Sequence, residues 1–255
     1  MLYTVSLLAI LGSAPLVLAG LLILPAPYGR FASKAWGPVM SARAGWVVME
    51  LPALFVIPIA ALWGADFSAG PSPLAVSSVL LLCLWEAHYV YRTLVFPFLI
   101  RETGKGMPIL IVAMALIFNT MNGCANGISL AAHPRALGVG LGGDFIFAVG
   151  IGLFAAGFVI HVWADARLRG LRAPGETGYR IPAGGLFELV ACPNYFGEIL
   201  EWCGWALAAW SDAAAAFALF TASNLVPRAV VYRKWYRDRF PEYPAGRKRV
   251  IPFVF

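Results

Sequence analysis

The sequence predicts an all-α integral membrane protein with seven transmembrane helices, its N-terminus outside and its C-terminus in the cytoplasm. Of 255 residues, 60% are hydrophobic and only 13% are charged, which leaves too little polar surface for a soluble domain of this length. Apolar windows close to the ~20 residues needed to cross a bilayer recur along the whole chain. The length suits a single domain over residues 1–255.

The predicted spans follow one another through short connections. The first has neither the basic start nor the short apolar stretch of a cleaved signal peptide, so we expect a permanent helix. The sixth is the least apolar, because it carries three glutamates. The seven windows are Leu2–Leu24, Ala44–Trp63, Leu74–Ile100, Met107–Ala132, Phe145–Ala164, Gly185–Trp210 and Ala213–Val231.

Basic residues predict which connections face the cytoplasm. They follow the first, third, fifth and seventh windows, whereas the connections after the second and sixth have none and the fourth is followed only by Arg135. Cytoplasmic loops carry an excess of Lys and Arg, so the odd-numbered windows exit to the cytoplasm. Topology alone explains most of the net charge of +6; the alternative is that part of this charge binds an anionic cofactor.

Five glutamates lie inside apolar windows, where a carboxylate is disfavoured by roughly 2.5–3.5 kcal/mol. Such residues usually face a protein interior or a wet cavity and mark a functional site. Glu50 is followed by Pro52, which removes a backbone N–H and favours a helix irregularity beside the carboxylate. The five are Glu50, Glu86, Glu188, Glu198 and Glu201.

The third window carries a polar stripe. Glu86, Tyr89 and Thr93 recur at i, i+3 and i+7, so they share one helical face, with Arg92 on a neighbouring line. Either this stripe only holds helices together, or it lines a site. In a site, a phenol with a pKa of about 10 remains a hydrogen-bond donor at neutral pH, and a carboxylate beside it either orients it or stays protonated as a second donor.

Three polar and aromatic clusters fall on the predicted cytoplasmic side. Arginine suits bidentate phosphate binding, and an amide flanked by carboxylates on one helical face matches a carboxamide group. Taken singly, these clusters are explained by interfacial aromatic residues and positive-inside anchoring; together they favour an anionic cofactor. They contain Arg172, Tyr179 and Arg180; Asn194, Glu198 and Glu201; and Arg228, Tyr232, Arg233 and Tyr236.

Motifs along nearly the whole chain resemble the steroid 5α-reductase family. In the N-terminal half they are Trp46 with Glu50-Leu51-Pro52, and His88-Tyr89 with Arg92-Thr93. The last 80 or so residues match most densely. They contain Pro174-Gly175-Glu176, Tyr179-Arg180-Ile181-Pro182, Gly184-Gly185-Leu186-Phe187, Asn194-Tyr195-Phe196-Gly197-Glu198, Glu201-Trp202, Phe240-Pro241-Glu242-Tyr243-Pro244, Arg247-Lys248 and Ile251-Pro252-Phe253-Val254-Phe255.

The resemblance implies a seven-helix membrane reductase that uses NADPH, and no metal, to reduce a C=C bond conjugated to a ketone, as in 3-oxo-Δ4-steroids of the testosterone or progesterone type. Residues 1–143 would mainly form the substrate pocket and residues 144–255 the NADPH site. Glu50 and Tyr89 would be catalytic at the ketone, and Trp46 and Phe118 would complete the substrate pocket. The residues implied to surround NADPH are His161, Asp165, Arg172, Tyr179, Arg180, Asn194, Glu198, Arg228, Tyr232 and Tyr236.

Other functions share part of this pattern. An enoyl-thioester or polyprenol reductase would use the same hydride chemistry. A methyltransferase using S-adenosylmethionine would use similar C-terminal helices, but it usually carries Arg-His where this chain has Ala191-Cys192. A sterol-binding or transport protein would leave the basic loop unexplained. We expect a lipid or steroid substrate and membrane lipids as partners, without nucleic acid or an obligate protein partner. The Ala- and Gly-rich composition suggests a bacterial inner membrane, with the endoplasmic reticulum for eukaryotic relatives.

Overall fold

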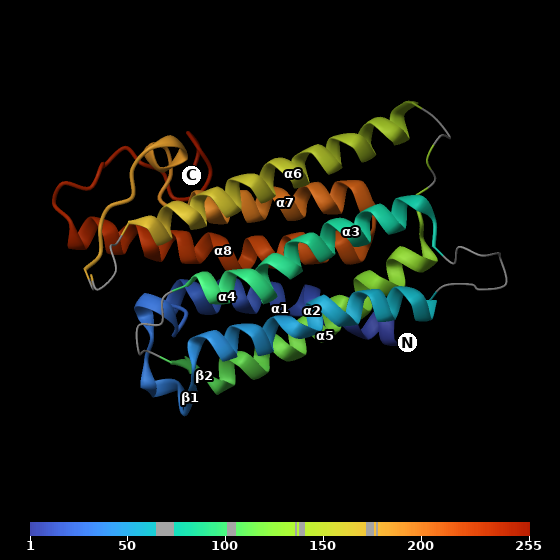
Figure 1. The fold of residues 1–255 in the computed structure, drawn as a ribbon, viewed down its shortest axis with the longest axis horizontal. Helices are drawn as coiled ribbons and strands as arrows, with labels where there is room; N and C mark the ends of the chain where they lie inside the picture. The colour runs from blue at the N-terminus through green and yellow to red at the C-terminus, as the bar shows by residue number, and fades with distance from the viewer. Residues whose placement is uncertain (65–73, 101–105, 136, 138–140, 172–175, 177) are drawn as a thin grey trace.

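The computed structural model is a bundle of long helices with short connections (Figure 1). It describes residues 1–64, 74–100, 106–135, 137, 141–171, 176 and 178–255. A two-residue strand pair, β1 (Val39–Met40) and β2 (Met107–Pro108), joins two connections at one end of the bundle. The long helices are α1 (Leu2–Ile23), α2 (Ala42–Gly64), α3 (Val76–Val90), α5 (Ile109–Ala132), α6 (Leu141–Gly170), α7 (Pro193–Ala209) and α8 (Asp212–Arg239).

The helical membrane class is as the sequence predicts. Among the described residues, six helices are long and apolar enough to cross a membrane; α7, with 17 residues, is not one of them. The two chain ends lie at opposite ends of the bundle (Figure 1). The number of crossings and the side on which each terminus lies remain predictions. The six helices are Leu2–Ile23, Ala42–Gly64, Val76–Leu99, Ile109–Ala132, Asp144–Gly170 and Asp212–Arg239.

The predicted sixth span, Gly185–Trp210, is wrong at its beginning. Gly184 and Gly185 have φ values of 88° and 57°, a left-handed backbone that favours glycine, and a short 3₁₀ turn follows over Gly185–Glu188. Val190 then forms a bridge with Lys248 near the C-terminus. The helix starts only at Pro193. Proline suits the first helical position, because the N–H that it lacks would have no partner within the helix there.

The third window is helical but not uniform. Helix α3 continues into a π-helical turn at Tyr91–Val95 and then into α4 (Phe96–Leu99), which has Pro97 in its first turn. Single π turns interrupt α-helices frequently at functional sites. Here the turn leaves the Arg92 carbonyl to accept a hydrogen bond from Trp46 Nε1 at 3.1 Å. This contact ties the end of the third span to α2.

Helices α6 and α7 pack with their backbones in contact through four glycines. A methyl group placed on Gly157 of α6 would lie 2.5 Å from the Gly197 carbonyl oxygen of α7. One placed on Gly197 would lie 2.5 Å from the backbone nitrogen of His161. Gly150 and Gly204 make equally close approaches about two turns away on their own helices. Small residues permit such packing in membranes, where apolar surface alone does not drive helices together.

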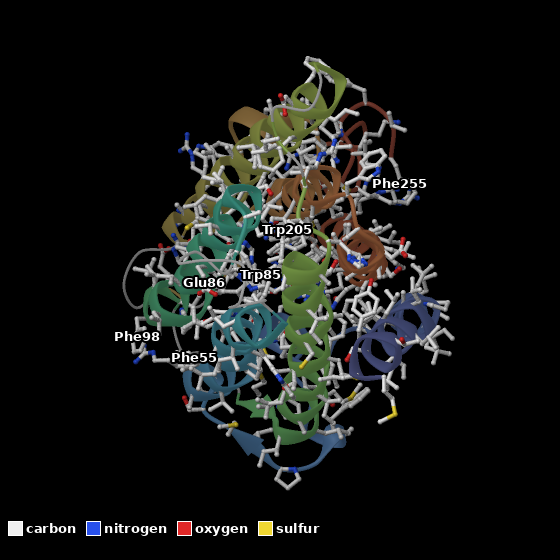
Figure 2. All side chains as sticks on the ribbon, turned by 90° about the vertical axis from the view of Figure 1, so that its right-hand side faces the viewer. Phe55, Trp85, Glu86, Phe98, Trp205 and Phe255 are labelled. Carbon is white, nitrogen blue, oxygen red and sulfur yellow. The ribbon has the colours of Figure 1, made fainter. Side chains whose placement is uncertain are left out.

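Large aromatic side chains fill the space between α3, α7 and α8. Trp85 and Trp205 are almost completely buried, and their indole N–H groups donate to the carbonyls of Ala53 at 2.8 Å and Leu81 at 3.0 Å. Figure 2 shows both rings inside the bundle, whereas Phe55 and Phe98 point outward. An apolar exterior around a hydrogen-bonded aromatic interior is the arrangement that a lipid environment requires.

Gly157→Ala is expected to destabilise the protein by about 1–3 kcal/mol, because the methyl group would force α6 and α7 apart. Thermal unfolding in detergent measures this loss. Gly152→Ala on the same helix is the matched control, since a methyl group there meets nothing within 4 Å and alanine favours the helix by up to about 1 kcal/mol. Equal unfolding temperatures for the two variants would contradict the packing argument.

Candidate active site

The bundle encloses one large cavity among its described residues, with a volume of about 990 Å³. Its size is at the upper end of small-molecule sites. All the predicted site residues except Arg172, which lies outside the described residues, line this cavity. Their division between substrate and cofactor stays a prediction. They are Trp46, Glu50, Tyr89, Phe118, His161, Asp165, Tyr179, Arg180, Asn194, Glu198, Arg228, Tyr232 and Tyr236.

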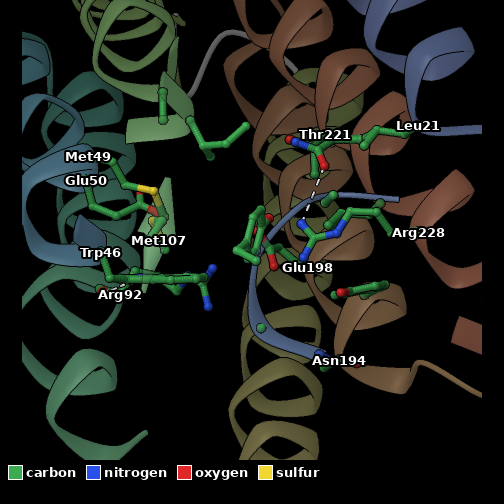
Figure 3. Close-up of a pocket in the computed structure, with 18 of the residues that line it drawn as sticks. Leu21, Trp46, Met49, Glu50, Arg92, Met107, Asn194, Glu198, Thr221 and Arg228 are labelled. Atoms are coloured by element: carbon green, nitrogen blue, oxygen red, sulfur yellow. Dashed lines mark hydrogen bonds between the residues drawn. The ribbon is translucent and has the colours of Figure 1, made fainter. Parts of the chain in front are cut away.

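The cavity has two walls of different chemistry, seen on opposite sides of Figure 3. We call the side formed by Trp46, Glu50, Tyr89 and Phe118 the α2–α5 wall. The facing side, the α6–α8 wall, carries most of the polar groups. It consists of His161, Asp165, Asn194, Glu198, Arg228, Tyr232 and Tyr236.

Glu50 on the α2–α5 wall is held by an amide from the neighbouring helix. Asn119 Nδ2 donates to the Met49 carbonyl at 2.7 Å and lies 3.3 Å from Glu50 Oε2. Asn119 was not among the residues predicted from the sequence. The sequence did offer a signal for it. Asn119, Asn122 and Asn126 form a polar stripe in a window that has no charged residues.

Tyr89 is fixed by packing rather than by a carboxylate. Its ring lies 5.0 Å from Trp85, 4.9 Å from His88 and 5.8 Å from Trp202, measured between ring centroids. Only 5% of the residue is exposed. Within the described part of the chain, no hydrogen bond joins Tyr89 to Glu50.

Arg92 lies between the two walls. Its guanidinium carbon is 4.7 Å from the Trp46 ring centroid and 4.8 Å from that of Phe96. Across the cavity, its Nη1 lies 3.8 Å from Asp165 Oδ2. Figure 3 shows the side chain extending from the α2–α5 side toward the cavity. The sequence indicated Arg92 only as a neighbour of Tyr89, without a role.

The α6–α8 wall is a connected set of charges and amides. Asn194 Nδ2 donates to Asp165 Oδ1 at 3.1 Å, and His161 Nε2 lies 3.4 Å from Asp165 Oδ2 and 3.9 Å from Glu198 Oε2. The glycine contacts between α6 and α7 bring these side chains together, because they set the spacing and register of the two helices. Carboxylates, an amide and an imidazole thus converge on one side of the cavity.

Arg228 of α8 extends this wall toward the end of the bundle with the C-terminus. Its guanidinium carbon lies 5.0 Å from the Tyr28 ring centroid and 5.1 Å from that of Tyr195. Nη1 donates to Asn224 Oδ1 at 3.5 Å, while the buried Nε has no hydrogen-bond partner among the described residues. A cation of this kind is suited to a bound anion.

A second cation, Arg30, lies in a cage of four aromatic rings. Its guanidinium carbon is 4.2 Å from the nearest ring centroid, that of Trp235, and its Nη2 donates to the Tyr236 hydroxyl at 3.1 Å. No local pattern indicated Arg30, because its partners lie some 150–200 positions away in the sequence. The other rings are Tyr179, Tyr232 and Tyr236.

Cys192 lies between these cations at the cavity surface but remains a neutral thiol. Burial raises its pKa to about 12, and the nearby charges of Arg30 and Arg228 lower it only in part. A thiolate is the reactive form of cysteine, so nucleophilic chemistry at this position is disfavoured.

Comparison with known proteins shows the family to which this chain belongs. Residues 105–255 match the family described as 3-oxo-5-alpha-steroid 4-dehydrogenase. The chain is 44% identical to the human "3-oxo-5-alpha-steroid 4-dehydrogenase 1" over 228 residues, which cover 89% of this chain and 86% of the human one. The Macaca fascicularis protein of the same name is 45% identical over 228 residues, 89% of this chain and 84% of that one.

A plant relative is similar over an even larger part of the chain. "Steroid 5-alpha-reductase DET2" of Arabidopsis thaliana is 40% identical over 255 residues, covering 98% of this chain and 95% of the plant protein. These likenesses include both halves of the bundle and therefore both walls of the cavity. The chain belongs to the 3-oxo-5-alpha-steroid 4-dehydrogenase family, whose members are oxidoreductases that act on a CH–CH group.

Proposed function

We propose that this protein uses NADPH to reduce the Δ4 C=C bond of a 3-oxo-Δ4-steroid, of the testosterone or progesterone type, to the 5α-dihydro product. The supporting observation is a single cavity that combines a wall bearing Glu50 and Tyr89 with a wall bearing amides, carboxylates and cations. We further propose that it works in a bacterial inner membrane, with the C-terminus in the cytoplasm, where NADPH is present.

The α6–α8 wall fits NADPH by its donor set. Arg228 Nε and Arg30 Nη1 are buried donors without partners among the described residues, and arginine is the side chain best suited to phosphate oxygens. Asn194 and Glu198 offer a donor and acceptors for a carboxamide. Tyr179, Tyr232 and Tyr236 would hold the adenosine end, and Arg180 would bind the phosphates. We propose the same role for Arg172, which lies outside the described residues.

The α2–α5 wall fits a flat apolar ketone. Phe118 stacks on Phe220 at a centroid distance of 3.7 Å, and Trp46 packs against Phe96 at 5.2 Å. These rings would contact the steroid skeleton. Glu50 and Tyr89 are polar groups of this wall, and they would contact the ketone oxygen.

When bound, NADPH supplies the hydride to the β-carbon of the enone. Charge then develops on the ketone oxygen, and donors held in a dry site stabilise it most strongly. We assign Tyr89 as one donor. Because no hydrogen bond joins Glu50 to Tyr89 in the described structure, and the Asn119 amide lies beside Oε2, we assign protonated Glu50 as a second, independent donor through Oε1. Solvent would protonate the α-carbon.

Incubation of the detergent-purified protein with NADPH and testosterone or progesterone tests this function. We expect the 5α-dihydro product, identified by chromatography and mass spectrometry, together with NADPH oxidation. Reduction of a different enone or enoyl lipid, with no steroid product, would keep the reaction type and reject the substrate. NADPH binding without any reduction would contradict the proposed reaction.

Tyr89→Phe should lower kcat by about 10²-fold or more, because it removes one donor to the developing oxyanion. The Kd for NADPH, measured by tryptophan fluorescence, should not change. Tyr91→Phe is the matched control, since Tyr91 lies two positions further along the same span and does not line the cavity. A Tyr89→Phe enzyme with near-normal turnover would remove Tyr89 from the proposed mechanism.

A further inference from the structure

Three buried polar side chains from three helices meet behind the cavity. Glu201 of α7 has no exposed side-chain surface, and the side chains of His88 of α3 and His161 of α6 are each 2% exposed. His88 Nδ1 lies 2.7 Å from Glu201 Oε1, at hydrogen-bonding distance. His161 Nδ1 lies 3.4 Å from the other oxygen, Oε2.

Glu201 itself does not line the cavity, but both histidines do. His88 directly precedes Tyr89, and the two rings meet edge to face at 4.9 Å. On the other side, His161 Nε2 lies 3.4 Å from Asp165 Oδ2. One carboxylate therefore connects residues on opposite walls of the cavity.

His161 lies between carboxylates at both ring nitrogens. Nδ1 faces Glu201, while Nε2 faces Asp165 and, at 3.9 Å, Glu198. At these distances no hydrogen bond is formed to Glu201, since His161 Nδ1 and Glu201 Oε2 are both buried without a hydrogen-bond partner among the described residues. A ring that carries both protons would place a positive charge between the carboxylates and compensate their burial. A buried carboxylate without such compensation is strongly destabilising. Arg92, 3.8 Å from Asp165, supplies the next positive charge.

The same three side chains have a spacing that metal ions also use, with their ligand atoms all within 4.8 Å of one another. However, tetrahedral ligands with bonds of about 2.0–2.1 Å stand roughly 3.3 Å apart. The 2.7 Å separation of His88 from Glu201 is instead the length of a charge-assisted hydrogen bond. The geometry favours a proton between these groups rather than an ion.

We propose that Glu201 is a positioning residue that acts through His88 and His161. Through His88 it fixes α3 and hence Tyr89. Through a doubly protonated His161 it fixes Asp165, the hydrogen-bond partner of Asn194. This inference rests on the proposed function. The network would set the distance between the enone and the hydride donor, and the rate of hydride transfer depends steeply on that distance.

Nitrogen NMR of the histidine rings tests the network without any reaction. The chain has only three histidines, and the third, the exposed His133, is an internal reference. After ring ¹⁵N labelling, single His88→Asn and His161→Asn variants assign the signals. We expect two protonated nitrogens on the His161 ring in the wild type. In Glu201→Gln we expect a shifted Nδ1 signal, because Nδ1 then faces a neutral amide while Nε2 still faces Asp165 and Glu198. A neutral wild-type ring, or no change in the variant, would overturn the proposal.

Kinetics test the consequence for the active site. Glu201→Gln should lower kcat by about 10²-fold, the size expected for a displacement of about 1 Å, and should weaken NADPH binding about tenfold. Adding His161→Asn to Glu201→Gln should cost little more, because coupled residues are not additive. Glu86→Gln is the control, because it also neutralises a glutamate in a membrane span but lies off the cavity. Its kcat and its affinity for NADPH should equal those of the wild type.

The outcomes separate the two proposals. Unchanged kcat and NADPH affinity in Glu201→Gln would reject the positioning role. If Glu201→Gln does not fold, His161→Asn alone should lower kcat and weaken NADPH binding to the same extent. An unchanged kcat and an unchanged Kd for NADPH in that variant would also reject the positioning role of Glu201. A wild type that binds NADPH but reduces no enone would reject the proposed function, while the NADPH affinities of the variants would still decide the role of Glu201.

Discussion

Backbone contact between α6 and α7 is the constraint on which the site depends. Glycines at Gly150, Gly157, Gly197 and Gly204 let the two helices approach so closely that any side chain at these positions would overlap the opposite backbone. Helices in lipid gain little from apolar contact alone, so this close fit sets their register. The register places His161 and Asp165 of α6 opposite the amide and carboxylates that α7 carries.

Polar partners from neighbouring segments explain how a membrane protein tolerates several internal carboxylates. Glu201 lies 2.7 and 3.4 Å from histidine nitrogens of two other helices, and Glu50 lies beside the Asn119 amide at the cavity. Glu188, which the sequence placed within a span, instead precedes α7 and accepts a hydrogen bond from the Gly184 backbone at 2.6 Å. Glu86 remains half-buried, and its Oε1 has no hydrogen-bond partner among the described residues. Glu50 and Glu201, at and beside the cavity, thus have polar neighbours, whereas Glu86 lies off the cavity.

Features that repeat along the chain were predictable from the sequence, and contacts between distant segments were not. Apolar windows predicted the long helices because each span buries its own backbone bonds, and two of the five glutamates inside those windows, Glu50 and Glu198, line the cavity. The start of α7 was missed, because Gly184, Gly185 and the bridge from Val190 to Lys248 override an apolar run. Asn119 and Arg30 were missed because their partners come from other helices.

We propose that the two walls hold an enone and NADPH in one cavity so that hydride passes directly to the β-carbon. Transfer of label from NADPH deuterated at the reactive C4 position of the nicotinamide tests this most directly. Reduction of testosterone should place one deuterium at C5 of the steroid, located by NMR and mass spectrometry. Deuterium at C3 of an alcohol product, or a reduced steroid without label, would contradict the account.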